Sequence, residues 1–191
     1  MQTLNKKYDS IMAAGHSLFW KHGFRRVTIE EICQKANVCK MTFYKYFADK
    51  TDLAKKVFNK IVEEGEEQIR KIMKEDSPPP EKIRKMIMLK MEGTNNVSYE
   101  FLQDFYSLSG ELKDYVEKRT RSAWDMLIID FKEAQNAGIF RKDFKAELVI
   151  KIQSKIIELL EDKSVISMYD SQQEMLMDFA KFMFYGVAPH D

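Results

Sequence analysis

The sequence of 191 residues is short of the two residue types that turns require, with only 7 glycines and 4 prolines. Together they make up about half the share found in an average protein, which argues against a β-sandwich or a barrel, because those folds need many turns. Disorder is excluded too, since 45% of the residues are hydrophobic. No apolar run approaches the roughly 18 residues of a membrane span, and the first ten residues lack the apolar core of a signal peptide. We expect a cytoplasmic protein without a membrane partner.

Metal-binding and catalytic patterns are also missing. Cys33 and Cys39 are the two cysteines, too few for a disulfide framework or a zinc module. The three histidines, His16, His22 and His190, have no metal-ligand spacing. The sequence contains no glycine-rich phosphate loop, nucleophile elbow or paired-carboxylate signature. We therefore expect no cofactor, no metal site and no enzymatic activity.

Charge is present in both signs but is unevenly distributed along the chain. The formal net charge is only +1, which by itself gives no reason to expect nucleic-acid binding. Residues 1–60, however, contain 12 Lys and Arg against 5 Asp and Glu, whereas the remaining 131 residues contain 19 against 25. A basic first third on an acidic remainder indicates two different functions in one chain.

Apolar residues recur at helical spacing from end to end, which predicts an all-α protein with about nine helices. Thr28 with Glu31 forms a predicted capping box, and Cys39 and Asp49 stand at the next two helix starts. Two short helices joined by a tight turn and preceded by a longer helix, near 4–22, make a helix-turn-helix candidate. Further helices are expected near 50–74, 81–95, 98–108, 111–136, 144–162 and 171–186.

The functional division expected from these elements has three parts. Residues 1–49 would form a DNA-binding helix-turn-helix domain. Residues 50–76 would form a connecting helix, which the Ser-Pro-Pro-Pro run at 77–80 ends. Residues 77–191 would form a helical bundle for ligand binding and dimerisation.

The predicted second helix of the motif has a buried and an outward side. On a helical wheel over 40–47, Phe43 and Phe47 share one face, which anchors the helix in a small core. The other side offers ammonium, hydroxyl and methyl groups, which suit the acceptors and thymine methyls of a major groove. Helix starts and phenols nearby suit phosphate. The candidate DNA-contacting residues are Thr28, Lys40, Met41, Thr42, Tyr44, Lys45, Tyr46 and Lys50.

Two runs, 23–32 and 36–47, together with Lys50 and Leu53, resemble the TetR/AcrR family of bacterial transcriptional regulators. The resemblance covers about residues 5 to 55. It implies phosphate contacts from Thr28, Tyr44, Tyr46 and Lys50, and base contacts from Lys40, Met41, Thr42 and Lys45. At Cys39 the family usually has Ser or Thr, so this cap is poorer. Redox sensing by the Cys39 thiol is a second hypothesis for that position.

The acidic remainder is rich in methionine and phenylalanine at helical spacing. Core packing is the simpler interpretation, but flexible thioethers and aromatic rings in a helical bundle also suit an adaptable apolar pocket. The candidate ligand-binding residues are Met86, Met91, Phe101, Phe105, Tyr106 and Trp124.

The last two expected helices are apolar on more than one side, which predicts a two-fold homodimer built through them. The candidate interface residues are Ile152, Ile156, Leu160, Phe179 and Met183. The sequence therefore predicts a homodimeric repressor that binds a palindromic operator in double-stranded DNA and is released by a small hydrophobic ligand. Two alternatives stay open: an architectural or partner-binding DNA-binding protein without an effector, and a lipid carrier.

Overall fold

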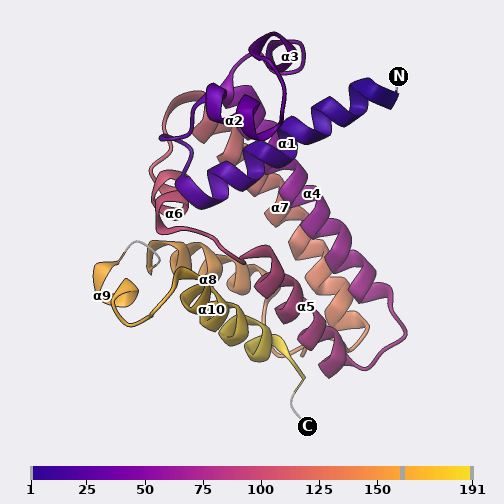
Figure 1. Ribbon diagram of the computed structural model, residues 1–191. Helices are drawn as coiled ribbons and strands as arrows, with labels where there is room; N and C mark the ends of the chain where they lie inside the picture. The colour runs from indigo at the N-terminus through magenta and orange to yellow at the C-terminus, as the bar shows by residue number, and fades with distance from the viewer. Residues whose placement is uncertain (1, 160–161, 190–191) are drawn as a thin grey trace. The chain divides into compact units, whose positions relative to one another are not determined.

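Every regular element in residues 2–159 and 162–189, the part of the chain that the computed structural model describes, is a helix (Figure 1). The side chains of residues 2–5, 106, 124, 150, 153, 154 and 156–158 lie outside this description. Ten helices occur in this part, and the predicted all-α class is confirmed. The helix beyond the expected nine is α9 (Lys163–Ile166), which begins where the Asp162 carboxylate accepts the N–H of Ser164 at 2.8 Å.

The described chain folds as two units. The first unit contains the residues up to Glu63 and Asn96–Arg119, and the second contains Glu64–Asn95 and the residues from Thr120 onward. The first unit holds α1 (Gln2–His22), α2 (Ile29–Lys35), α3 (Lys40–Tyr44) and α6 (Tyr99–Tyr106). The second holds α5 (Pro79–Gly93), α8 (Ala146–Leu159), α9 and α10 (Gln172–Val187). Helices α4 (Lys50–Lys74) and α7 (Gly110–Asn136) contribute residues to both.

Helix α1 ends at His22, directly before Gly23. Gly23 has a φ of +77°, and its N–H donates to the carbonyl of Phe19 at 2.9 Å. Phe24 then folds back, and its ring centroid lies 5.6 Å from that of Phe19. A Cβ at Gly23 would lie 2.5 Å from Oδ2 of Asp104 on α6. Gly23 is therefore required both by its left-handed backbone and by the close approach of α6.

Local side-chain bonds start α2 and α4 at the predicted residues. The Thr28 hydroxyl accepts the N–H of Glu31 at 3.2 Å, and the Glu31 carboxylate accepts the N–H of Thr28 at 2.8 Å. At α4, the Asp49 carboxylate accepts the N–H of Asp52 at 2.8 Å, and the Asp52 carboxylate accepts the N–H of Ala48 at 3.1 Å. Each pair satisfies N–H groups that have no partner within the helix.

The core of the first unit joins α1, α2, α3, α4 and the first part of α7. Its most deeply buried side chains are Ile11, Ile32, Phe43, Phe47 and Leu53, each at most 1% exposed. Complete burial of a side chain such as Phe43 contributes about 2–3 kcal/mol relative to exposure. This core therefore holds α3, which is too short to be stable alone.

Helix α3 is shorter than the sequence predicts. The expected helix over 40–47 ends at Tyr44, because the N–H groups of Lys45 and Tyr46 donate to carbonyls three residues back, at 3.3 and 3.0 Å. Such bonds tighten the last turn. The N–H of Phe47 still reaches the carbonyl of Phe43 at 3.0 Å. The two phenylalanine rings consequently stay on the same side, with centroids 5.5 Å apart.

The second unit has its own core of apolar side chains from α4, α5, α7, α8 and α10. Its buried members are Ile72, Ile83, Met86, Ala134, Ile139, Phe140, Val149 and Val187. Helices α5 and α10 pack along each other.

Helix α5 starts at Pro79, because the proline run that ends α4 also supplies residues suited to a helix start. Lys82, which is 5% exposed, donates through Nζ to the carbonyls of Met73 and Glu75 at 2.6 and 2.5 Å and so caps the end of α4.

We expect Gly23→Ala to lower the free energy of unfolding of the first unit by about 3 kcal/mol, because the new Cβ meets Asp104 and the backbone stays left-handed. Gly110→Ala is the matched control, since Gly110 has a φ of +62° but an added Cβ there meets nothing within 4 Å. Its loss should be about 1 kcal/mol. Urea unfolding followed by circular dichroism measures both, and equal losses would contradict the close approach at Gly23.

Candidate nucleic-acid interface

Helix α3 buries one side and exposes the other. Phe43 and Phe47 are at most 1% exposed, whereas Met41 is 74% exposed and Tyr44 is 54% exposed. Lys45, which follows the helix, is exposed as well. A large apolar side chain on the surface next to phenol and ammonium groups is a pattern of binding surfaces. This outward side contains the predicted base-contacting residues.

The start of α3 is held without a side-chain cap. Cys39 is the N-cap residue, and its Sγ accepts no backbone N–H of the helix. Sγ lies instead 3.4 Å from Oγ1 of Thr42, a hydrogen bond that lowers the pKa of the Cys39 thiol. The hydroxyl of Thr42, a predicted base contact, is thus engaged within its own helix turn.

Lys40, the first residue of α3, forms an ion pair with Glu30 of α2. Both side chains are largely exposed, at 55% and 61%. The pair was not predicted, because it joins residues of two different helices. It places a carboxylate directly beside the predicted base-contacting lysine.

Lys50 occupies a different place from the one its predicted role requires. Its Nζ donates to the carbonyls of Phe24 and Val27 at 2.8 Å and of Arg25 at 3.2 Å, and it lies 4.5 Å from the centroid of the Phe24 ring. Burial lowers the pKa of this lysine. The ammonium group therefore ties α4 to the segment that leads into α2, and the predicted phosphate contact remains a prediction.

Tyr46 lies closer to the core than Tyr44. Its ring packs edge-on against Tyr8 of α1 with centroids 5.9 Å apart, and Tyr8 in turn stacks on Phe47 at 5.2 Å. Lys56 donates to the Tyr46 carbonyl at 3.2 Å. Helix α1 and α4 thus fix the residues that follow α3.

Sequence reasoning missed a contact between α6 and the turn before α2. The Asp104 carboxylate accepts the backbone N–H of Arg25 at 2.7 Å and lies 3.6 Å from Nε of the same arginine. The Arg25 guanidinium also donates to the carbonyl of Ser107 at 2.7 Å. No local pattern marks this pair, because its members are 79 residues apart. Lys50 and Asp104 therefore hold the 24–27 segment from two different helices.

The predicted ligand-binding residues do not form one described cluster. Met86 lies in the core of the second unit at 2% exposure, and Met91 is 45% exposed. Phe101 and Phe105 belong to the first unit, where Phe101 packs against Trp20 with ring centroids 4.3 Å apart. The side chains of Tyr106 and Trp124 lie outside the described residues. The ligand-binding role of these residues remains a prediction.

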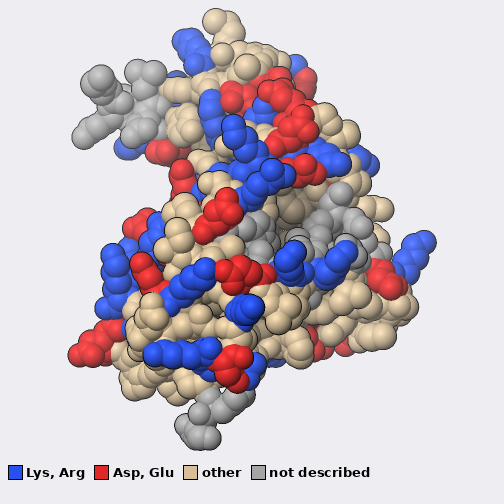
Figure 2. Space-filling model, turned by 180° about the vertical axis from the view of Figure 1, so that it is seen from behind, with Lys and Arg blue, Asp and Glu red and all other residues tan. Residues whose placement is uncertain are grey.

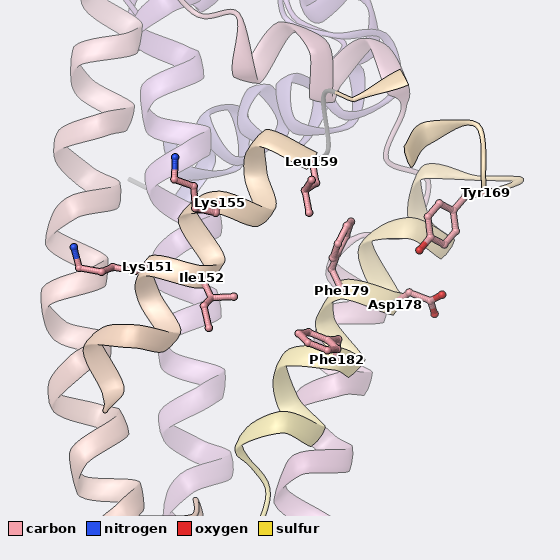
Figure 3. A pocket seen from close by; sticks show the side chains of 8 residues that line it. All are labelled: Lys151, Ile152, Lys155, Leu159, Tyr169, Asp178, Phe179 and Phe182. Carbon is pink, nitrogen blue, oxygen red and sulfur yellow. The ribbon is translucent and has the colours of Figure 1, made fainter. Parts of the chain in front are cut away.

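A groove of about 780 Å³ lies between α8 and α10 in the second unit (Figure 3). Figure 3 shows Phe179 and Phe182 of α10 facing Ile152 and Leu159 of α8. Lys151, Lys155, Tyr169 and Asp178 complete its lining. Phe182 is 71% exposed and Ile152 is 40% exposed, so the groove presents apolar surface.

The predicted interface residues fall partly on this groove. Ile152 and Phe179 line it, whereas Met183 is half-buried against the core of the second unit. The side chain of Ile156 and the whole of Leu160 lie outside the described residues.

Charge on the described surface is mixed. On the face seen in Figure 2, Lys and Arg side chains are interspersed with Asp and Glu. Within the described residues, no helix is long and apolar enough to span a membrane, and no three His, Cys, Asp or Glu side chains group as metal ligands would.

Comparison with known proteins supports a regulator. Residues 11–57 match the family model described as bacterial regulatory proteins, tetR family. This range contains α2, α3 and the start of α4. No curated protein sequence matches the chain.

Solved structures match over nearly the whole chain. A TetR-family regulator from Agrobacterium tumefaciens has a TM-score of 0.72 at 16% identity, covering 97% of this chain and 100% of that one. The fatty acid degradation regulator FadR from Bacillus halodurans has a TM-score of 0.69 at 18% identity, covering 94% and 95%. FadR from Bacillus subtilis, solved in complex with stearoyl-CoA, has a TM-score of 0.68 at 18% identity, covering 94% and 99%. At such identities the likeness shows the fold.

We expect Thr28→Ala to raise the pKa of Glu31. Hydrogen bonds from the N–H and the hydroxyl of Thr28 lower the pKa of this carboxyl from its ordinary 4.5, and the substitution removes the hydroxyl bond. Because the pKa is lowered on folding, the stabilisation that the carboxylate gives is present above about pH 4.5 and is lost as the pH falls through the lowered value. Carbonyl ¹³C NMR titration measures the pKa, and Thr28→Ser is the control that keeps the hydroxyl. The same Glu31 pKa in Thr28→Ala and the wild type would contradict the capping box.

Proposed function

We propose that the chain is a homodimeric repressor that a small hydrophobic ligand releases from a palindromic operator; the match of residues 11–57 to the family model of bacterial regulatory proteins, tetR family, supports this proposal. One observation carries the DNA-binding part. Helix α3 is fixed by Phe43 and Phe47 in the core and leaves Met41 and Tyr44 more than half exposed. The matched family model supports a regulatory role.

The exposed side of α3 has the chemistry of direct readout. Met41 offers a methyl group for a thymine methyl, and Lys40 and Lys45 offer donors for guanine O6 and N7. The Tyr44 hydroxyl suits a phosphate oxygen, which fixes register without reading sequence. Thr28 begins α2, where N–H groups and the helix dipole also favour phosphate. We assign phosphate contacts to Tyr46 and Lys50 as well, through the Tyr46 hydroxyl and through the Lys50 ammonium group once it leaves the carbonyls that it contacts.

One helix of five residues reads too few base pairs for selectivity. Two copies held about 34 Å apart contact successive major grooves on one side of B-form DNA, and their affinities combine. A two-fold dimer therefore implies a palindromic site with half-sites about 10 base pairs apart.

The groove between α8 and α10 is the surface that we assign to dimerisation. Five apolar or aromatic side chains on these helices are at least 40% exposed: Leu148, Ile152, Leu159, Phe182 and Tyr185. Contiguous apolar surface of this kind is typical of an interface. Packing α8 and α10 of one protomer against those of its partner would cover it.

The ligand part of the proposal rests on composition and on the fold. The second unit contains many methionine side chains, which adapt to apolar ligands. The Bacillus subtilis structure with the same fold holds stearoyl-CoA, and another, from Mycobacterium tuberculosis at a TM-score of 0.55, is described as a ketosteroid regulator. A long-chain acyl-CoA is accordingly the first probe.

An effector-free DNA-binding protein is the second candidate function. Met86 is 2% exposed in the core of the second unit, and the half-buried Phe101 packs against Trp20, so these two candidates already have packing partners. That packing favours a protein whose partner binds to its surface and not in an internal pocket. The ligand titration described below separates the two functions.

We expect the purified protein to enrich a palindrome from a library of randomised duplexes. The double variant Met41→Ala/Thr42→Ala should then bind the enriched duplex about 100-fold more weakly, because it loses contacts to bases in both half-sites, each of which gives about 1–3 kcal/mol. Fluorescence anisotropy measures the affinity. Met168→Ala, a change at a side chain that is 72% exposed and lies between α9 and α10, is a surface control.

Absence of any enriched sequence would overturn the DNA-binding proposal, as would full affinity in the double variant. Adding stearoyl-CoA to the preformed complex tests release in the same assay. Binding of the ligand to the protein must weaken operator binding by the same coupling free energy, of order 1–3 kcal/mol. Acyl-CoA that binds the protein without changing operator affinity would favour the effector-free alternative.

We expect Phe182→Asp to shift the protein to a monomer, because the substitution replaces the largest exposed apolar side chain of the groove with a carboxylate that the interface would have to desolvate. The dimer dissociation constant should rise by at least about 100-fold, as measured by analytical ultracentrifugation. Met168→Asp is the matched control, since Met168 is equally exposed, at 72%, but does not line the groove. A dimer of unchanged affinity in Phe182→Asp would place the interface elsewhere.

A further inference from the structure

Glu30 differs from the other acidic side chains around the helix-turn-helix in what its carboxylate does. The Glu31 carboxylate accepts N–H and hydroxyl groups of Thr28, and those of Asp49 and Asp52 cap the start of α4. These three stabilise helix starts. The Glu30 carboxylate instead crosses from α2 to α3 and pairs with Lys40.

The ion pair lies on the surface proposed to face DNA. Lys40 is the first residue of α3 and directly precedes Met41, whose side chain is 74% exposed. The side chains of Lys40 and Glu30 are 55% and 61% exposed, so neither is held in place by burial. The hydrogen bond between them lowers the pKa of Glu30 and raises that of Lys40. Both groups are therefore charged at neutral pH.

A duplex must compete with this carboxylate for Lys40. As long as the ammonium group stays on Glu30, one phosphate contact is lost. The number of cations that the duplex releases on binding then falls by about one for each protomer.

We propose that Glu30 is a positioning residue that restrains Lys40 and thereby weakens the binding of DNA of any sequence. The inference rests on the proposed DNA-binding function. Its consequence is selectivity: non-specific affinity comes almost entirely from phosphate contacts, so reducing it raises the ratio of specific to non-specific binding. Glu30 thus favours sites at which base contacts compensate for the broken ion pair.

The test measures binding of the full chain to a 30-base-pair duplex of scrambled sequence at several KCl concentrations between 50 and 300 mM. We expect Glu30→Gln to bind roughly threefold more tightly per protomer at the lowest salt, because it removes an exposed ion pair that competes with DNA. The plot of log affinity against log salt concentration should become steeper by about 0.9 per protomer.

Glu67→Gln is the matched control for the loss of one negative charge. Glu67 also forms an exposed ion pair with a lysine, Lys71, at 2.7 Å, with side chains 64% and 59% exposed. It lies on α4 in the second unit, whereas α3 belongs to the first. Its slope should equal that of the wild type, and an equal steepening in both variants would overturn the proposal in favour of a general charge effect.

A second comparison asks whether Glu30 acts through Lys40. In a Lys40→Gln background, Glu30→Gln should leave affinity and slope unchanged. A steepening that persists there would mean that Glu30 repels phosphates directly, which overturns the positioning role. An unchanged slope in Glu30→Gln alone also overturns it, while the proposed function stands. If the wild type binds no duplex at 50 mM KCl, the proposed function fails together with the inference.

Discussion

The burial of Phe43 and Phe47 is the constraint on which the proposed DNA-binding surface depends. Helix α3 has five residues and could not form alone, so its position is set by two aromatic rings in a core that α1 and α4 complete. Because those rings take one side of the helix, Met41 and Tyr44 must take the other. The exposure of the functional residues is thus a consequence of packing and needs no separate explanation.

Local interactions are what the sequence predicted well. The capping box of Thr28 and Glu31 and the start of α4 after Asp49 both follow from residues within four positions of one another. The end of α3 was mispredicted, because bonds to carbonyls three residues back replaced the regular pattern after Tyr44. Apolar spacing alone does not distinguish a helix from such a tightened turn.

Contacts between distant residues could not be predicted. Lys50 has the sequence context of a phosphate-binding lysine, yet the carbonyls that its ammonium group contacts belong to a segment about 25 residues earlier. The pair of Glu30 and Lys40 joins two helices, and the pair of Arg25 and Asp104 joins a turn to a helix. Such pairs depend on how helices pack, and the local pattern contains no information on packing geometry. For the same reason the sequence could not distinguish ligand-binding side chains from core side chains, since both kinds of position contain the same residue types.

Two lysines, Lys50 and Lys82, bind backbone carbonyls and not carboxylates. The start of α3 has no such support, since the Cys39 side chain bonds no N–H of the helix. Its first turn is held instead by the burial of Phe43, by the hydrogen bond between Cys39 and Thr42 and by the ion pair between Glu30 and Lys40. Because the hydrogen bond and the ion pair are exposed and weak, exchanging them for contacts with a duplex costs little free energy, which lets the same chain adapt to half-sites that differ in shape.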